Sequence, residues 1–183
     1  LRSYCGSPAA GEGAEASAHF IRGLKVTPKS AGSRAGAGLF AAVAGNSASS
    51  RWSFRNIRLI NAQVEGQGDA GKRLPAGALV GSASDASFEN CWVYWEGEEL
   101  EELKASIAGA ELRDRNYRVT GSNAGGLAGE LDGGSITNCL AATLVRGTNT
   151  VGGLVGLATG FVTADHAYAD CYLGGGASSI AGL

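Results

Sequence analysis

The sequence predicts an all-β fold, a solenoid of about five rungs with one short helical insertion. A leucine phrase recurs as Ala-Gly-Leu-Phe at 37–40, Gly-Ala-Leu-Val-Gly at 77–81, Gly-Gly-Leu-Ala-Gly at 125–129 and Gly-Gly-Leu-Val-Gly at 152–156. A second phrase, Phe-Glu-Asn-Cys at 88–91 and Ile-Thr-Asn-Cys at 136–139, starts nine residues after the repeat leucine (88 − 79 and 136 − 127). Repeats of this size stack on one another, because a single repeat cannot bury its apolar face alone.

The composition supports this architecture. Glycine provides 30 of the 183 residues without a three-residue period, which excludes collagen. Hydrophobic residues make up 44% and recur in register, which excludes a disordered linker. The formal net charge of −2 gives no electrostatic indication of a nucleic-acid partner. No run of about 18 apolar residues is present, so we expect no membrane insertion within this chain.

We expect two regions along the chain. Residues 1–20 are rich in Gly, Ala, Ser and Glu and show no period, which predicts an irregular N-terminal leader or cap. The solenoid repeats are predicted over 21–183, starting with Ile-Arg-Gly-Leu-Lys-Val at 21–26, which matches the later segment 54–59. The chain contains no methionine and stops inside a fifth leucine phrase at 180–183, which indicates a processed protein or a piece of a longer one.

Within each repeat, brief apolar runs bounded by Gly, Asn, Asp and Ser predict short strands joined by corners. Glycines this frequent exclude a helix, since each costs about 1 kcal/mol in a helix interior. Residues at the same phase should stack into columns. One column is expected to hold the leucines Leu39, Leu79, Leu127 and Leu154, and another the bulky residues Phe54, Phe88, Ile136 and Val162. Asn56, Asn90 and Asn138 should form an amide ladder at a bend, which Ala164 would end in the last repeat.

The four cysteines lack the spacing of a zinc site. Cys91 and Cys139 share a phase in consecutive repeats, so they should lie one rung apart, about 4.8 Å. That separation suits a stacked pair of buried thiols, and it is also within the range that a disulfide bridges. Cys5 and Cys171 have no repeat equivalents, and their pairing would suit an extracellular protein.

About twenty extra residues separate the second and third clear repeats. Within them, Leu100, Leu103 and Ile107 lie at positions i, i+3 and i+7, which predicts a helix over 97–109 laid against the side of the solenoid. Just before it, the run at 91–95 places Trp92 and Tyr94 on one face and Val93 and Trp95 on the other. The outward pair would offer flat aromatic area to a protein or glycan partner, unless the helix covers it.

The phrases Gly-Gly-Leu-Ala-Gly and Ile-Thr-Asn-Cys resemble the GLUG motif, closely over 124–156 and fairly over 76–95. GLUG repeats occur in large bacterial surface and secreted proteins, including adhesins and the non-catalytic parts of immunoglobulin-A-cleaving metallopeptidases. The resemblance implies a right-handed parallel β-helix at the cell surface or outside the cell. It transfers no catalytic residues, and the metallopeptidase motif His-Glu-x-x-His is absent from this sequence.

We therefore predict a non-catalytic extracellular scaffold, either adhesin-like or self-assembling into a surface fibre. Its partners would be further copies stacked end to end, a host or matrix protein, or a glycan, and no cofactor or metal is expected. The alternative is a carbohydrate-binding or polysaccharide-active β-helix. Clustered carboxylates would perform that cleavage, but the corner acids Asp85, Asp132 and Asp165 are also what turns require.

Overall fold

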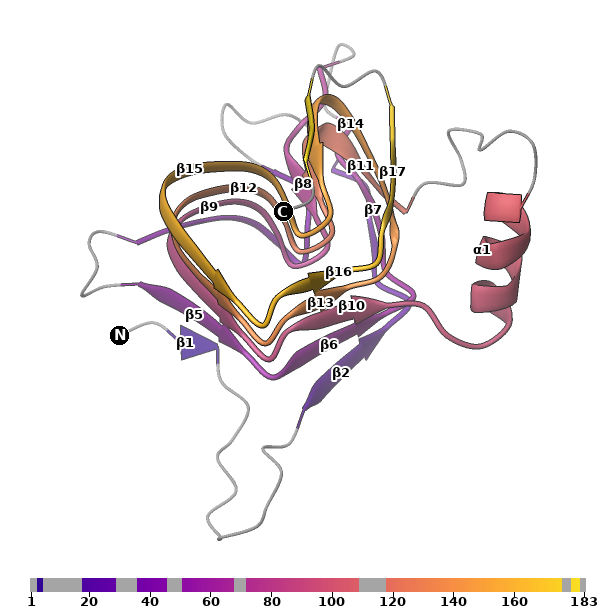
Figure 1. Ribbon diagram of the computed structural model, residues 1–183, viewed down its shortest axis with the longest axis horizontal. Coiled ribbons are helices and arrows are strands. Elements are labelled where there is room, and N and C mark those ends of the chain that lie inside the picture. The colour runs from indigo at the N-terminus through magenta and orange to yellow at the C-terminus, as the bar shows by residue number, and fades with distance from the viewer. Residues whose placement is uncertain are drawn as a thin grey trace, which may run out of the picture.

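Three parallel sheets and one helix form the regular structure of the described residues in the computed structural model (Figure 1). The structure describes residues 3–4, 18–28, 36–45, 51–67, 72–108, 118–175 and 179–181. The named strands pair in parallel in all three sheets. The expected all-β class with parallel pairing is confirmed.

The strands divide among the sheets as follows. Sheet A contains β1 (Ser3–Tyr4), β4 (Phe40–Ala44), β5 (Trp52–Arg55), β9 (Val80–Glu89), β12 (Ala128–Thr137) and β15 (Val155–Asp165). Sheet B contains β2 (His19–Arg22), β6 (Ile57–Ile60), β10 (Trp92–Tyr94), β13 (Leu140–Ala141) and β16 (Tyr168–Ala169). Sheet C contains β3 (Lys25–Val26), β7 (Gln63–Glu65), β8 (Ala76–Gly77), β11 (Val119–Gly125), β14 (Leu144–Gly152), β17 (Tyr172–Gly174) and β18 (Ser179–Ala181).

The chain visits sheets A, B and C in that order and then returns to sheet A beside its earlier strand. We call one such passage a circuit. In Figure 1 the circuits overlie one another as nested outlines that run from indigo to yellow. One circuit corresponds to one sequence repeat, because consecutive leucine phrases open consecutive strands of sheet A.

The leucines of the recurring phrase lie above one another inside the circuits. The backbone N–H of Leu79 donates to the carbonyl of Leu127 at 3.0 Å, and that of Leu127 donates to Leu154 at 2.9 Å. These three side chains are buried, whereas Leu39 is half-buried and its N–H donates to Ala78. A parallel ladder thus repeats one apolar position at the strand spacing and fills the interior.

The aromatic column beside the leucines differs from the expectation at its last member. Phe54 stacks on Phe88 with ring centroids 5.1 Å apart, and Phe88 pairs with Ile136. Ile136 then pairs with Ala164, not with Val162. The cause is a bulge in β15, where two residues lie opposite one of β12, so the spacing from Leu154 is ten residues instead of nine.

The glycines of the leucine phrase allow two backbones to approach closely. A Cβ on Gly129 would lie within 3.0 Å of backbone atoms of Ala76, Gly81 and Asn123. Gly125 is crowded in the same way. Neither glycine has a positive φ. The phrase therefore marks a reversal where the end of sheet C lies against the start of sheet A, visible as the inward fold beside β8 in Figure 1.

At the corner between sheets A and B, a residue in the left-handed backbone conformation recurs at the same position of successive circuits. Asn56, Asn90 and Asn138 have φ of 57°, 54° and 49°. The Nδ2 of Asn90 donates to Oδ1 of Asn56 at 3.2 Å, and Nδ2 of Asn138 donates to Oδ1 of Asn90. His166, with φ 48°, takes the fourth position, because Asn138 donates its N–H to the carbonyl of Asp165. The expectation that Ala164 holds this position is wrong, again because of the bulge.

The helical insertion is α1 (Glu98–Ala108), which lies outside the sheets beside the corner of sheets B and C (Figure 1). Its Leu100 packs against Trp95 and Leu144. The side chains of Leu103 and Ile107 lie outside the described residues. The helix thus covers a small apolar cluster on the side of the sheets, and it does not enter the main core.

Two further expectations, on the N-terminal segment and on the cysteines, can be compared with the structure. Strand β1 lies inside the segment 1–20 that was expected to be an irregular leader, with Ser3 paired to Ser53, and β2 begins in it at His19. Cys91 and Cys139 are buried free thiols, so the alternative of a disulfide between them is wrong. The hydrogen bond with Cys139, together with burial, raises the pKa of the Cys91 thiol. The pairing of Cys5 with Cys171 involves a residue outside the described ranges.

Candidate functional site

The outward face of sheet B carries an unbroken column of mostly apolar side chains. It runs across five strands in printed register: Phe20 pairs with Arg58, Arg58 with Trp92, Trp92 with Leu140, and Leu140 with Tyr168. We call this set the sheet B column. Its members come from five circuits, so the column extends along the whole described stack.

The alternation of the strands explains why these side chains point outward. Leu59, Val93 and Ala141, which directly follow Arg58, Trp92 and Leu140 in the sequence, are buried in the main core. Because side chains alternate along a strand, the column residues before them face away from the core. Phe20 and Tyr168 are each 61% exposed, while the three members between them are half-buried. Exposed aromatic side chains in register on a sheet are a feature of binding surfaces.

The middle of the column is held in place by polar contacts. The Arg58 guanidinium lies over the Trp92 ring, 3.7 Å from its centroid, and donates to the carbonyl of Asn90. The indole N–H of Trp92 donates to the carbonyl of Asn138 at 3.3 Å. Burial lowers the pKa of Arg58 from its ordinary value, but a guanidinium remains charged in proteins. The ring and the cation are therefore pre-organised on the surface.

A polar cleft of about 550 Å³ adjoins the column at the corner with sheet C. It is lined by Arg22, Asn61, Glu96 and Glu99, with glycines 23 and 97. Arg22 forms an ion pair with Glu96, and Asn61 exchanges two hydrogen bonds with the backbone of Glu96. An occupant of the column would therefore meet charged groups at its edge.

The structure separates the three aromatic residues singled out from the sequence. Trp92 and Tyr94 lie on the outward face and are half-buried. Trp95 is only 7% exposed, with the guanidinium of Arg118 4.3 Å from its ring centroid and Leu100 of α1 packed against it. Sequence reasoning missed Phe20, Arg58, Leu140 and Tyr168. Aligning the repeats from their asparagine corners would have found Arg58 and Leu140, which lie two positions after Asn56 and Asn138. Phe20 and Tyr168 follow corners without an asparagine, so only the strand pairing places them in the column.

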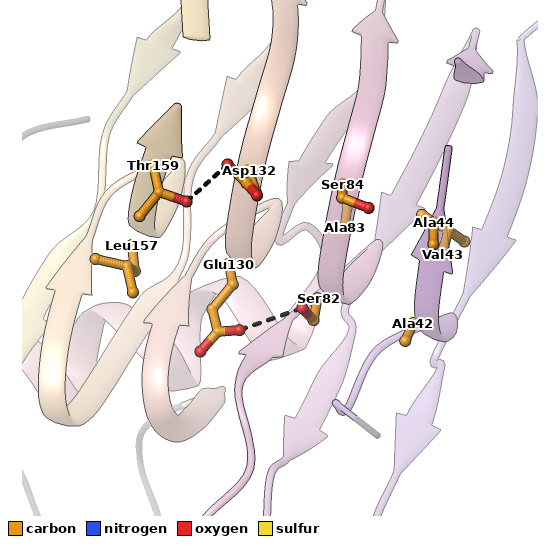
Figure 2. A pocket seen from close by; sticks show the side chains of 10 residues that line it. All are labelled: Ala42, Val43, Ala44, Ser82, Ala83, Ser84, Glu130, Asp132, Leu157 and Thr159. Atoms are coloured by element: carbon orange, nitrogen blue, oxygen red, sulfur yellow. Dashed lines mark hydrogen bonds between the residues drawn. The ribbon is translucent and has the colours of Figure 1, made fainter. Parts of the chain in front are cut away.

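A second concavity crosses sheet A and holds about 540 Å³ (Figure 2). Figure 2 shows Glu130 accepting a hydrogen bond from Ser82, at 3.2 Å, and Asp132 accepting one from Thr159, at 3.1 Å. Glu130 also accepts from Nδ2 of Asn123 at 2.5 Å. Both carboxylates are thus engaged with neighbouring strands.

The three corner acids considered from the sequence do not converge. Asp85 forms a left-handed corner with φ 49°, and Asp165 pairs with His166 at 2.8 Å. Asp165 lies six residues along β15 from Thr159, the partner of Asp132. Among the described residues, no three His, Cys, Asp or Glu side chains lie close enough together to hold a metal ion.

None of the described helices is long and apolar enough to span a bilayer. No family model matches the sequence, and no curated protein matches it. Among solved structures, a similar chain is described as "a putative immunoglobulin A1 protease from Bacteroides ovatus". The likeness has a TM-score of 0.52 at 21% sequence identity and covers 91% of this chain. Our chain spans about half of that protein, 54% of its length, and at this identity the likeness shows the fold alone.

Proposed function

We propose that this chain is a right-handed parallel β-helix of the GLUG-motif kind that works outside the cell as a non-catalytic, adhesin-like scaffold. The sheet B column carries the proposal. Its aromatic and aliphatic side chains lie at one phase of successive circuits, and the three middle strands, β6, β10 and β13, bury their other face in the main core. A surface of this kind gains affinity by burying flat apolar area without reordering itself.

The chemistry of the partner follows from the column and the adjoining cleft. Tryptophan and tyrosine faces stack on the apolar faces of sugar rings or grip apolar side chains of a protein. Arg22 and Arg58 add cationic donors that suit carboxylate groups on either partner. The extracellular assignment is supported by the GLUG-like phrases at 125–129 and 136–139.

Direct binding tests the proposal. The protein would be applied to a glycan array and to immobilised extracellular-matrix proteins and immunoglobulin A1. Trp92→Ala and Tyr168→Ser should each weaken a binding signal by about tenfold or more, since each removes an aromatic face of the sheet B column. Phe161→Ala is the matched control, because Phe161 is 80% exposed but lies on sheet A.

Two results would count against the scaffold. Equal binding by the Trp92 and Phe161 variants would remove the sheet B column from the interface. Cleavage of immunoglobulin A1 by the purified chain, seen as fragments on a gel, would contradict a non-catalytic role. The neighbouring structure's printed description makes this antibody the first substrate to test.

The alternative is a carbohydrate-binding or polysaccharide-active β-helix, and the Figure 2 concavity favours it. There Glu130 and Asp132 lie two residues apart on β12 and share one outward face. A reducing-sugar assay on the polysaccharides bound in the array would distinguish the two functions. Sugar release that Glu130→Gln abolishes would establish a polysaccharide-active β-helix, and glycan binding that Glu130→Gln abolishes without release would establish a carbohydrate-binding one. Silence in both assays would leave the scaffold.

A further inference from the structure

The two ends of the sheet stack present strands that pair on one side only, within the part of the chain that the structure describes. At one end β2 pairs with β6, and β3 pairs with β7. At the other end β16 pairs with β13, and β17 pairs with β14. The free side of such a strand carries unpaired N–H and C=O groups, which can pair with a strand of another chain.

The exposed large apolar side chains of the described residues gather at these same two ends. One lies on β2 and four lie on β15, β16 and β17: Phe20, Leu157, Phe161, Tyr168 and Tyr172. In the last circuit, inward positions such as Ala158, Ala164 and Ala169 are also exposed, although their equivalents one circuit earlier are buried. Among the described residues, nothing covers this end of the core, and a further circuit laid on it would bury it.

Extending the printed register by one strand shows which residues would meet. Phe20 belongs to the column that ends at Tyr168. Arg22 belongs to the column that passes through Tyr94 and ends at Asp170, whose N–H donates to Ala141. A first circuit placed on the last one would set the phenyl ring of Phe20 against Tyr168 and the guanidinium of Arg22 against the Asp170 carboxylate.

A third column, on sheet C, can be extended across the junction in the same way. Lys25 pairs with Gln63, and Val64 pairs with Val119, which places Gln63 beside Arg118. That column continues through Leu144 to Tyr172. The Lys25 ammonium would therefore lie against the Tyr172 ring. The three juxtapositions are an aromatic pair, an ion pair and a cation–π pair, and all three are attractive.

We propose that a second copy of this chain docks head to tail, with its β2 and β3 added to β16 and β17 of the first copy. The inference rests on the proposed scaffold and specifies one of its partners. The contact uses different surfaces on the two copies, and it adds each copy along the direction in which the strands already stack. Such a head-to-tail contact displaces every copy along one axis and therefore builds an open filament instead of a ring. The sheet B column then continues across each junction through Phe20 and Tyr168.

Charge reversal at one position of the junction tests the docking. Asp170→Lys sets a lysine against Arg22 of the next copy, and Arg22→Glu sets a glutamate against Asp170. Each variant alone should lower the association constant by about a hundredfold, because like charges meet at the junction. An equimolar mixture should assemble again as an alternating filament. At one junction the introduced lysine meets the introduced glutamate, and at the next the native Asp170 meets the native Arg22. Sedimentation velocity over a range of concentrations and electron microscopy would follow the assembly.

Glu89→Lys is the matched control, because it makes a comparable charge reversal on β9, which already pairs with β5 on one side and β12 on the other. It should assemble as the unmodified chain does. An unmodified chain that stays monomeric at every concentration, or a mixture that does not recover assembly while both variants are folded by circular dichroism, would overturn the inference. The array assay keeps the two proposals apart: an unassembled Asp170→Lys variant that still binds through Trp92 leaves the scaffold standing.

Discussion

Replacing Leu127 by alanine tests whether the interior leucine column stabilises the fold. Leu127 is fully buried and lies between Leu79 and Leu154, which are buried to the same degree. Backbone hydrogen bonds of 3.0 and 2.9 Å tie the three residues together, so the neighbours are held at the strand spacing and have little freedom to fill the space. Buried Leu→Ala changes cost about 2–5 kcal/mol, and a site that cannot collapse belongs in the upper half of that range.

We therefore expect Leu127→Ala to lower the free energy of unfolding by about 4 kcal/mol. For a chain of this length, each kcal/mol corresponds to roughly 2–4 °C in Tm, which gives a fall of roughly 8–16 °C. The measurement is urea and thermal unfolding followed by far-UV circular dichroism, at a protein concentration where the chain is monomeric.

Leu157→Ala is the control, because the same chemical change is made at a side chain that is 36% exposed on the last circuit. Its cost should stay below about 1.5 kcal/mol, since less apolar area returns to water and solvent fills the space. Equal losses for the two variants would refute the argument, because the leucine column would then contribute no more than a surface contact.

Three further outcomes follow from other features of the structure. Gly129→Ala should cost about 3 kcal/mol or prevent folding, because its Cβ would meet backbone atoms of two other segments; unchanged urea unfolding would contradict the close approach. Asn90→Ala should destabilise the protein by about 1–2 kcal/mol more than Asn90→Gly, since both variants lose the amide ladder but only alanine is strained at φ 54°; equal midpoints in urea would argue against the strain. Burial raises the pKa of Cys171 to about 11, so its thiolate fraction at pH 8 should be about a hundredfold below that of an ordinary thiol. Peptide-resolved alkylation of the native protein at several pH values would show slow modification of Cys171 that accelerates as the pH rises toward 11, and rapid modification at pH 8 would contradict this.

Residues that repeat at a constant spacing could be placed from the sequence. Leu79, Leu127 and Leu154 share a phase because each immediately precedes a strand of sheet A, and Asn90 and Asn138 share one because each immediately follows such a strand. A parallel ladder converts equal sequence spacing into vertical stacking, so these columns required no knowledge of the tertiary structure.

The sheet B column could not be predicted in the same way, because the repeats differ in length. The first repeat divides its sheet A strand into β4 and β5, which both pair with β9, and the last gains a residue at the bulge in β15. These changes move Phe20 and Tyr168 out of the spacing that relates Trp92 to Leu140. The relation among them is visible only once the strands are paired.

By itself, the sequence determined the all-β class, the period of the repeats and the apolar residues that recur, because burying one face in every repeat requires the same residue type at the same phase. The tertiary structure alone decided that the phrase glycines serve close backbone contact instead of positive φ, that Trp95 lies under α1, and that His166 completes the asparagine corner. Those outcomes depend on which segments, distant in the sequence, contact one another, and the spacing of residues within a repeat does not determine these contacts.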